Sequence, residues 1–203
     1  MKLFKLFVAL LFSLLATGCM TMRTPPYEAS INNYEPLQMG HYKKVALGDF
    51  SVSSSNLNLI SVRGNPLKSS VNDSFGSYLK AALEEELYKA GLLANDATCI
   101  ISGVLMENDI DTPFVTASGH ISANLVIKDK GKVLYDKVLT ATHEWESNFV
   151  GAIAIPRARD NYPFIVRAFI NALVEDPDFK KALTKGETAV DGVGPRQLSK
   201  SLK

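Results

Sequence analysis

The stretch "FVTASGHISANLVIK" (114–128) alternates strictly between apolar or small side chains and polar ones. Because successive strand residues point to opposite faces of a sheet, this pattern predicts a strand with one face in a core and the other in water. The apolar face carries Val115, Ala117, Gly119, Ile121, Ala123, Leu125 and Ile127, and the polar face carries Thr116, Ser118, His120, Ser122 and Asn124. A chain built around such a strand is expected to cover only one face of its sheet.

The next stretch, "VLYDKVLTATHEW" (133–145), continues the alternation, with Val133, Tyr135, Leu139, Ala141 and Trp145 on its apolar side. A two-residue loop at Lys130-Gly131 would pair Ile127 with Leu134 and set the two apolar faces on opposite sides. A three-residue loop, Asp129-Lys130-Gly131, pairs Ile127 with Val133 and gives Gly131 the position that needs a positive φ. We therefore predict the three-residue loop. It places Lys137 on the apolar face opposite Ala123, where the lysine must lie near a rim and extend to water.

The remaining elements follow from periodicity. "KKVALGDFSV" (43–52) predicts a strand, and "ATCIISGVLM" (97–106), apolar at successive positions, predicts an inner strand buried on both faces. Residues 53–68 are ambiguous and could add a short strand. Apolar residues that recur at steps of three and four predict a first helix. Ser69 or Ser70 can cap its start, and Gly91 can end it. Its apolar stripe comprises Val71, Phe75, Tyr78, Leu79, Ala82, Leu83 and Leu87.

A second helix is predicted within residues 161–175, with Pro163 in its first turn, and Asp176-Pro177 can end it and start a short third helix. The order is β-α-β-β-β-α, in which one strand–helix–strand crossover leads into an antiparallel meander. We expect an α+β fold, a two-layer sandwich of a mainly antiparallel four-stranded sheet with two helices packed on one face. The polar second face stays in contact with water.

The amino-terminal residues predict an export signal that ends at a cysteine. Lys2 and Lys5 precede an apolar run from Leu6 to Ala16, which is shorter than the roughly 20 residues that cross a bilayer. The segment "LATGC" (15–19) resembles the bacterial lipobox, although Ala16 replaces the usual leucine. That resemblance implies a diacylglyceryl group on Cys19 and an acylated amino terminus after removal of residues 1–18. An ordinary cleaved signal and an uncleaved anchor are the alternatives.

The resemblance also implies a location. Met20 is not the aspartate that retains many lipoproteins in the inner membrane, so we expect an outer-membrane anchor with the body on the periplasmic side. Residues 19–42, with three prolines and no sustained period, predict a lipidated tether. Residues 43–184 form the predicted domain, and residues 185–203 predict a disordered tail. Cys99 would then be the only unmodified cysteine of the mature chain and is expected to be buried and inert.

No catalytic or metal-binding set is apparent in the sequence. In the predicted register His120 faces the polar side beside Thr140, while His143 faces the apolar side beside Ala117, so the two do not converge on a metal. Glu107, Asp109 and Asp111 share one face of an extended chain and could gather a calcium ion, but a solvated strand end is the better interpretation. Without residues 1–18 the chain carries 20 basic and 21 acidic side chains, a balance that does not favour nucleic acid. We expect no cofactor and no enzymatic activity.

The segment "NFVGAIAIPRARDN" (148–161) is apolar and glycine-containing where a surface connection is expected. It could cover the open end of the helix–sheet core. Alternatively it forms an exposed interaction patch for a partner protein or an acyl chain, made of Phe149, Val150, Ile153 and Ile155.

The lipobox, the proline-bearing tether, the first strand "VALGDF" (45–50) and the helix end "LYKAGLL" (87–93) together resemble the YajG-like outer-membrane lipoproteins. They are also similar to the auxiliary lipoproteins of lipid-transporting ABC systems, and the first strand to that of the TolB amino-terminal domain. The likeness covers residues 11–184 in architecture, and its motifs are short. It implies a non-enzymatic accessory or structural component of an envelope assembly, with an envelope protein as partner. A lipid- or amphiphile-binding module, with the ligand between helix and sheet, and an envelope hydrolase are the alternatives.

Overall fold

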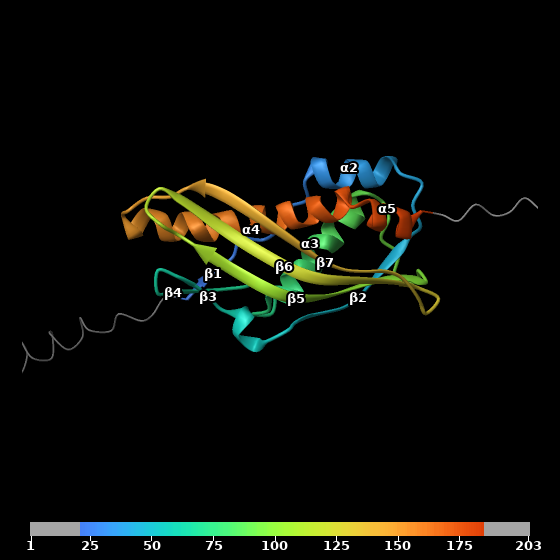
Figure 1. Cartoon of the computed structure of the whole chain (residues 1–203), viewed down its shortest axis with the longest axis horizontal. Coiled ribbons are helices and arrows are strands. Elements are labelled where there is room, and N and C mark those ends of the chain that lie inside the picture. The colour runs from blue at the N-terminus through green and yellow to red at the C-terminus, as the bar shows by residue number, and fades with distance from the viewer. Residues whose placement is uncertain (1–20, 185–203) are drawn as a thin grey trace, which may run out of the picture.

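The computed structural model describes residues 21–184. The expected signal peptide (1–18), the acylated Cys19 and the expected tail (185–203) lie outside the described residues. Within them the fold is α+β, with four α-helices and two sheets of four and three strands. The sequence predicted the larger sheet and the helices on it, but not the smaller sheet or the helix at residues 31–39 (Figure 1).

The larger sheet has the strand order β2-β5-β6-β7, made of β2 (Val45–Val52), β5 (Cys99–Asp111), β6 (Thr116–Asp129) and β7 (Lys132–Glu146). β2 runs parallel to β5, and β5, β6 and β7 are antiparallel neighbours. The predicted crossover and meander are therefore confirmed. β5 is an inner strand as expected, but only one of its faces is buried, because Ile100, Val104 and Met106 on the other face are 38–44% exposed.

The predicted β6–β7 loop is wrong in length. Asp129 pairs with Lys132, so the loop has two residues, Lys130 and Gly131, both with positive φ (51° and 83°) as a type I′ turn requires. A bulge restores the match of apolar faces: Lys128 pairs with Val133 and Ile127 with Tyr135, which leaves Leu134 as the extra residue. From Ile127 and Tyr135 onward odd residues face odd residues, but Lys137 lies opposite Leu125, and His143 opposite Gly119.

Helix α3 (Phe75–Lys89) starts later than predicted. Its N-cap is Ser74, whose hydroxyl accepts from the Ser77 amide, not Ser69 or Ser70. The Ser69 hydroxyl is already used by the Val71 amide in a local turn, and Asn72 and Asp73 have positive φ, which a helix does not allow. The end is as predicted: Gly91 has φ +68°, and the amides of Gly91 and Leu92 bond back to the carbonyls of Tyr88 and Leu87.

Helix α4 (Gly151–Glu175) is far longer than predicted, because residues 151–160 are helical and not a surface connection. Pro156 and Pro163 both lie inside it, although neither can donate a helical hydrogen bond. Proline is therefore a misleading start signal here. The short helix α5 (Pro177–Leu183) is confirmed, with the Asp176 carboxylate accepting from the Asp178 amide at 2.8 Å.

Residues 21–42, expected to form a tether, instead pack on the domain. β1 (Met22–Arg23) joins β4 (Asn65–Lys68) and β3 (Ile60–Val62) in the sheet β1-β4-β3, and α2 (Ile31–Met39) packs against α3 and α4. A 3₁₀ turn at Ser55–Asn58 precedes β3.

A buried carboxylate fixes this amino-terminal segment. Glu86 of α3 has no exposed surface, and its Oε1 accepts from the Tyr27 hydroxyl at 2.6 Å, the Ser30 amide at 3.0 Å and the Asn33 amide group at 3.0 Å. Burial, and then the neighbouring carboxylate, raise the pKa of the Tyr27 hydroxyl, so it remains a donor. The segment thus supplies three donors to one oxygen of this buried carboxylate, while Oε2 is buried without a hydrogen-bond partner among residues 21–184.

The core lies between the larger sheet and helices α3 and α4, which cover the same face (Figure 1). An aromatic cluster is centred on Tyr162, whose ring centroid lies 4.8 Å from that of Phe75 and 5.2 Å from that of Tyr78. Gly119 of β6 leaves room for Ile165 of α4, since a Cβ at this glycine would lie 1.9 Å from the Ile165 Cδ1. Cys99 is buried as expected, and burial raises the pKa of its thiol, which keeps it unreactive.

Candidate functional site

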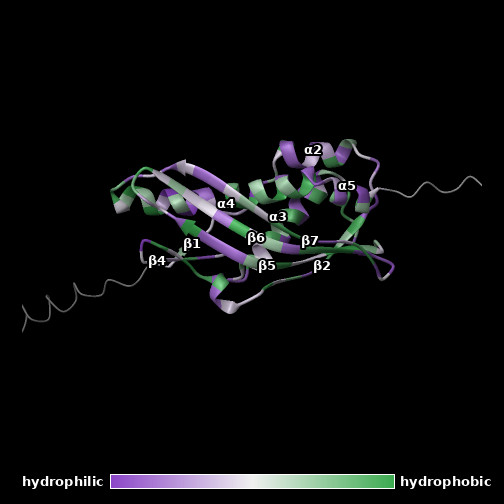
Figure 2. Cartoon of the chain, viewed as in Figure 1, coloured by the Kyte–Doolittle hydropathy of each residue, from purple (hydrophilic) through white to green (hydrophobic). Residues whose placement is uncertain are grey.

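One end of the molecule displays a cluster of exposed apolar side chains, which we call the apolar tip. It comprises Phe114 (73% exposed), Val115 (77%), Phe149 (74%), Val150 (37%) and Ile153 (45%). The first two lie in the β5–β6 loop and the others at the start of α4 and just before it. Figure 2 shows hydrophobic colouring over this loop and the start of α4, at the left end of the view. Exposed apolar clusters of this kind are typical of surfaces that bind a protein or a membrane.

Arg63, in the β3–β4 turn, joins the two segments of the apolar tip. Its guanidinium donates to the Thr112 carbonyl at 2.8 Å and 3.1 Å, the Asn148 carbonyl at 2.8 Å and the Phe149 carbonyl at 3.2 Å. It also lies 6.0 Å from the centre of the Phe114 ring. The Ser147 amide donates to the Val115 carbonyl at 2.8 Å, which links the same segments directly. The tip is thus held by hydrogen bonds from three parts of the chain.

The structure places three of the four predicted patch residues, Phe149, Val150 and Ile153, in the apolar tip. Ile155 is partly buried and packs on the core, because residues 151–160 are helical and Ile155 lies on another side of the helix. Sequence reasoning missed Phe114 and Val115, which it assigned to a strand. The available signal was Pro113, which directly precedes them and is typical of a loop.

The uncovered face of the larger sheet carries a second apolar surface, which we call the outer row. It comprises Ile100, Val104 and Met106 of β5 and Val138 of β7, with exposed fractions of 38–51%. Val104 and Val138 both pair with Asn124 of β6, so the row crosses three strands. The side-chain oxygen of Asn124 is buried and has no hydrogen-bond partner among the residues that the structure describes. This face therefore combines apolar side chains with an unused acceptor.

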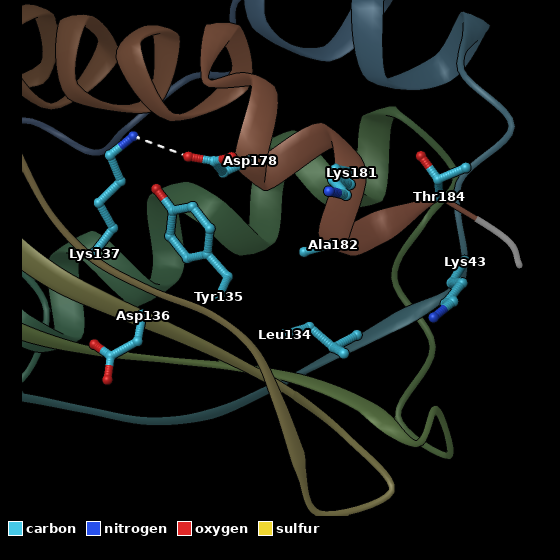
Figure 3. A pocket seen from close by; sticks show the side chains of 9 residues that line it. All are labelled: Lys43, Leu134, Tyr135, Asp136, Lys137, Asp178, Lys181, Ala182 and Thr184. Carbon is cyan, nitrogen blue, oxygen red and sulfur yellow. Dashed lines mark hydrogen bonds and ion pairs between the residues drawn. The ribbon is translucent and has the colours of Figure 1, made fainter.

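The opposite end of the molecule has a cavity of about 460 Å³ between β7 and α5 (Figure 3). Lys43, Lys137 and Lys181 line it together with Asp136 and Asp178. Lys137, the misfit on the apolar face, reaches Asp176 at 2.7 Å and Asp178 at 3.4 Å. The hydrogen bond to Asp176 raises the pKa of the Lys137 ammonium, so this lysine stays charged and cannot act as a base. Lys137 is therefore a fixed positive charge at this cavity.

The histidines lie on opposite faces, as predicted. His120 Nε2 lies 2.8 Å from Glu107 Oε2, and its Nδ1 lies 3.3 Å from the hydroxyl of Thr142, not Thr140. His143 lies 3.3 Å from the Asn161 side-chain oxygen and stacks between two aromatic rings. Asp109 and Asp111 are exposed on the same face as Glu107. Among residues 21–184, no three histidine, cysteine or acidic side chains gather closely enough to hold a metal ion.

No helix within the described residues is both long and apolar enough to cross a bilayer. No protein-family model matches the chain, and no curated protein matches it. A solved structure from Xanthomonas campestris, described by the family model DUF330, is similar over 80% of this chain and 96% of its own, with a TM-score of 0.52 and 9% identity. At that identity the likeness shows a shared fold.

Two further solved structures are more distant. A hypothetical protein from Chlamydia trachomatis covers 65% of this chain and 96% of its own, with a TM-score of 0.38 and 10% identity. A minor lipoprotein from Acinetobacter baumannii covers 70% and 93%, with a TM-score of 0.36 and 15% identity. Neither likeness is close enough to support an inference about this chain.

Proposed function

We propose that this chain is a bacterial lipoprotein, anchored in the outer membrane by lipid on Cys19, with its body on the periplasmic side. The observation that carries the anchor is the segment "LATGC" after a short apolar run. One acyl chain holds a protein only marginally on a membrane, whereas several hold it stably, so a triacylated amino terminus suffices without a spanning helix. Met20 supports the outer membrane as the destination.

The proposed role is that of a non-enzymatic accessory or structural component that binds an envelope protein through the outer row. The observation that carries this role is the one-sided covering of the larger sheet: helices pack on one face, while Ile100, Val104 and Met106 remain exposed on the other. This role is also the one implied by the resemblance to the YajG-like and ABC-auxiliary lipoproteins.

Binding of a lipid between helix and sheet is less well supported. Phe75, Tyr162 and Phe169 fill that layer and are at most 1% exposed. A ligand there would have to displace close-packed side chains. Native mass spectrometry of the purified protein tests this alternative, and a co-purifying lipid would favour it.

The anchor is tested by replacing Cys19 with alanine in the full chain. We expect the wild-type protein to sediment with outer membranes and to yield an amino-terminal peptide with the mass of a triacylated cysteine. Cys19→Ala should lose both properties. A Cys19→Ala chain that still carries lipid, or a wild-type chain without lipid, contradicts the proposal.

The partner surface is tested by photo-crosslinking in intact cells from a reactive residue at Met106. A partner should be captured, and Val104→Glu should abolish capture while the melting temperature stays close to that of the wild type. The matched control is Thr142→Glu, an exposed position on the same face outside the outer row. Equal loss of capture in both variants would show that the row itself is not the contact.

A further inference from the structure

We propose that the apolar tip enters the headgroup region of a zwitterionic bilayer, as a second membrane contact beside the acyl anchor. This inference rests on the proposed lipidation of Cys19. The two contacts together orient the body so that its long axis points away from the membrane, with the apolar tip at the membrane and the lysine-lined cavity at the far end. Three observations carry the proposal: where the chain enters the fold, how the tip is held, and which charges stand behind it.

The amino-terminal chain enters the fold beside the apolar tip. β1 runs parallel to β4, with Met22 beside Leu67 and Arg23 beside Lys68. The residues before Met22 therefore approach from the side of the β3–β4 turn, which carries Arg63. Three residues of chain separate Met22 from Cys19 in the sequence, and a chain of that length spans at most about 11 Å. Figure 1 shows β1, β3 and β4 toward the end where α4 begins, while α5 lies toward the other.

Backbone carbonyls of the apolar tip are hydrogen-bonded within the protein, as a poorly hydrated environment requires. A carbonyl group that leaves water without a hydrogen bond costs several kcal/mol in a bilayer. Arg63 supplies donors to the carbonyls of Thr112, Asn148 and Phe149 at 2.8–3.2 Å. The half-buried guanidinium thus satisfies three backbone carbonyls of the two segments, while the Phe114 and Phe149 side chains stay largely exposed.

Carboxylates behind the apolar tip limit both its depth and its choice of lipid. Asp111 ends β5 one residue before Thr112, and Glu146 ends β7 one residue before Ser147. Glu144 lies across the sheet from Asp111, since both pair with Ser118. All three are exposed. Arg63 in the tip and Arg157, whose guanidinium donates to the Glu146 carbonyl at 2.9 Å, offset two of these three charges. The remaining negative charge would still repel anionic lipid, so the membrane that fits is a zwitterionic one.

The test places an environment-sensitive fluorophore on Phe149→Cys in the mature, lipidated protein, reconstituted in vesicles of phosphatidylethanolamine and phosphatidylcholine that contain brominated lipid. Cys99 is 2% exposed and stays unlabelled. The control position is Tyr88→Cys, which is 67% exposed at the end of α3 far from the tip. Phe114→Cys provides a second tip position if the first variant folds poorly.

We expect brominated lipid to quench the probe at Phe149 and at Phe114 but not at Tyr88, because the headgroup and acyl boundary extends only about 5–10 Å. Replacing part of the lipid by phosphatidylglycerol should reduce quenching. Equal quenching at all positions, or none at the tip, overturns the inference. A tip probe that is shielded from water in cells but not quenched in pure vesicles indicates a protein partner and also overturns it.

The same sample separates this inference from the proposed function. An amino-terminal peptide without lipid refutes the anchor, whatever the probe shows. Lipidated protein with an unquenched tip refutes only the second contact.

Discussion

Replacing Gly76 with alanine tests how closely α3 packs on β2. A Cβ at Gly76 would lie 2.8 Å from both the carbonyl carbon and the carbonyl oxygen of Ser51, and 3.1 Å from its Cα. These are backbone atoms, so no side chain can rotate away, and the start of the helix must move. Overpacking of this kind costs about 1–3 kcal/mol.

The helix propensity of alanine opposes this cost and stabilises the variant. Alanine stabilises a helix over glycine by up to about 1 kcal/mol, because glycine loses more backbone entropy on folding. With the full helix gain, the net expectation for Gly76→Ala is a loss of about 0–2 kcal/mol, the overpacking cost less that gain. In a domain of this size that lowers the melting temperature by up to about 8 °C.

The matched control is Gly151→Ala. Gly151 is also in the first turn of a helix, but its added Cβ would meet only the Ile155 Cδ1, at an ordinary 3.6 Å. We expect this variant to be as stable as the wild type or slightly more so. Thermal and urea unfolding followed by circular dichroism measure both. If Gly76→Ala is at least as stable as Gly151→Ala, the close packing of α3 on Ser51 is refuted.

Three further predictions concern the polar groups. Glu86→Ala should release the amino-terminal segment and speed tryptic cleavage after Arg23, since three donors lose their acceptor; an unchanged cleavage rate would contradict this. Although burial opposes it, the Lys137 hydrogen bond holds the pKa of Asp176 below its usual value, so its stabilisation is present above about pH 4 and lost as the pH falls through the folded pKa. In Lys137→Met only the Asp178 amide and the Tyr135 hydroxyl still oppose burial at Asp176, so the free energy of unfolding should fall less as the pH drops below about 4 than in the wild type or in the exposed control Lys181→Met. Arg63→Lys should raise hydrogen exchange at residues 147–150 by about tenfold, a loss of about 1.4 kcal/mol of local stability, because an ammonium cannot reach all the carbonyls that the guanidinium bridges.

The sequence predicted the pairing of β6 with β7 because both strands have a two-residue period that separates an apolar face from a polar one. Matching the apolar faces required odd residues to face odd residues, and beyond the bulge they do. The loop length did not follow, because a three-residue loop and a two-residue loop with a bulge at Leu134 give the same parity. Three patch residues were found by their apolar character, but Phe114 and Val115 became part of the site only when Arg63 joined two loops distant in sequence.

Local pattern determined the alternating strands, the apolar stripe of α3 and the glycine at its end, because each of these depends on residues a few positions apart. The proposal of an export signal that ends at Cys19 rests on local pattern in the same way. Tertiary structure alone decided that residues 21–42 pack on the body, since the buried carboxylate of Glu86 and its donors are more than fifty positions apart. It also decided that α4 continues through two prolines and that the apolar tip faces the side from which the chain enters. These outcomes depend on contacts between distant segments, which no short stretch of sequence encodes.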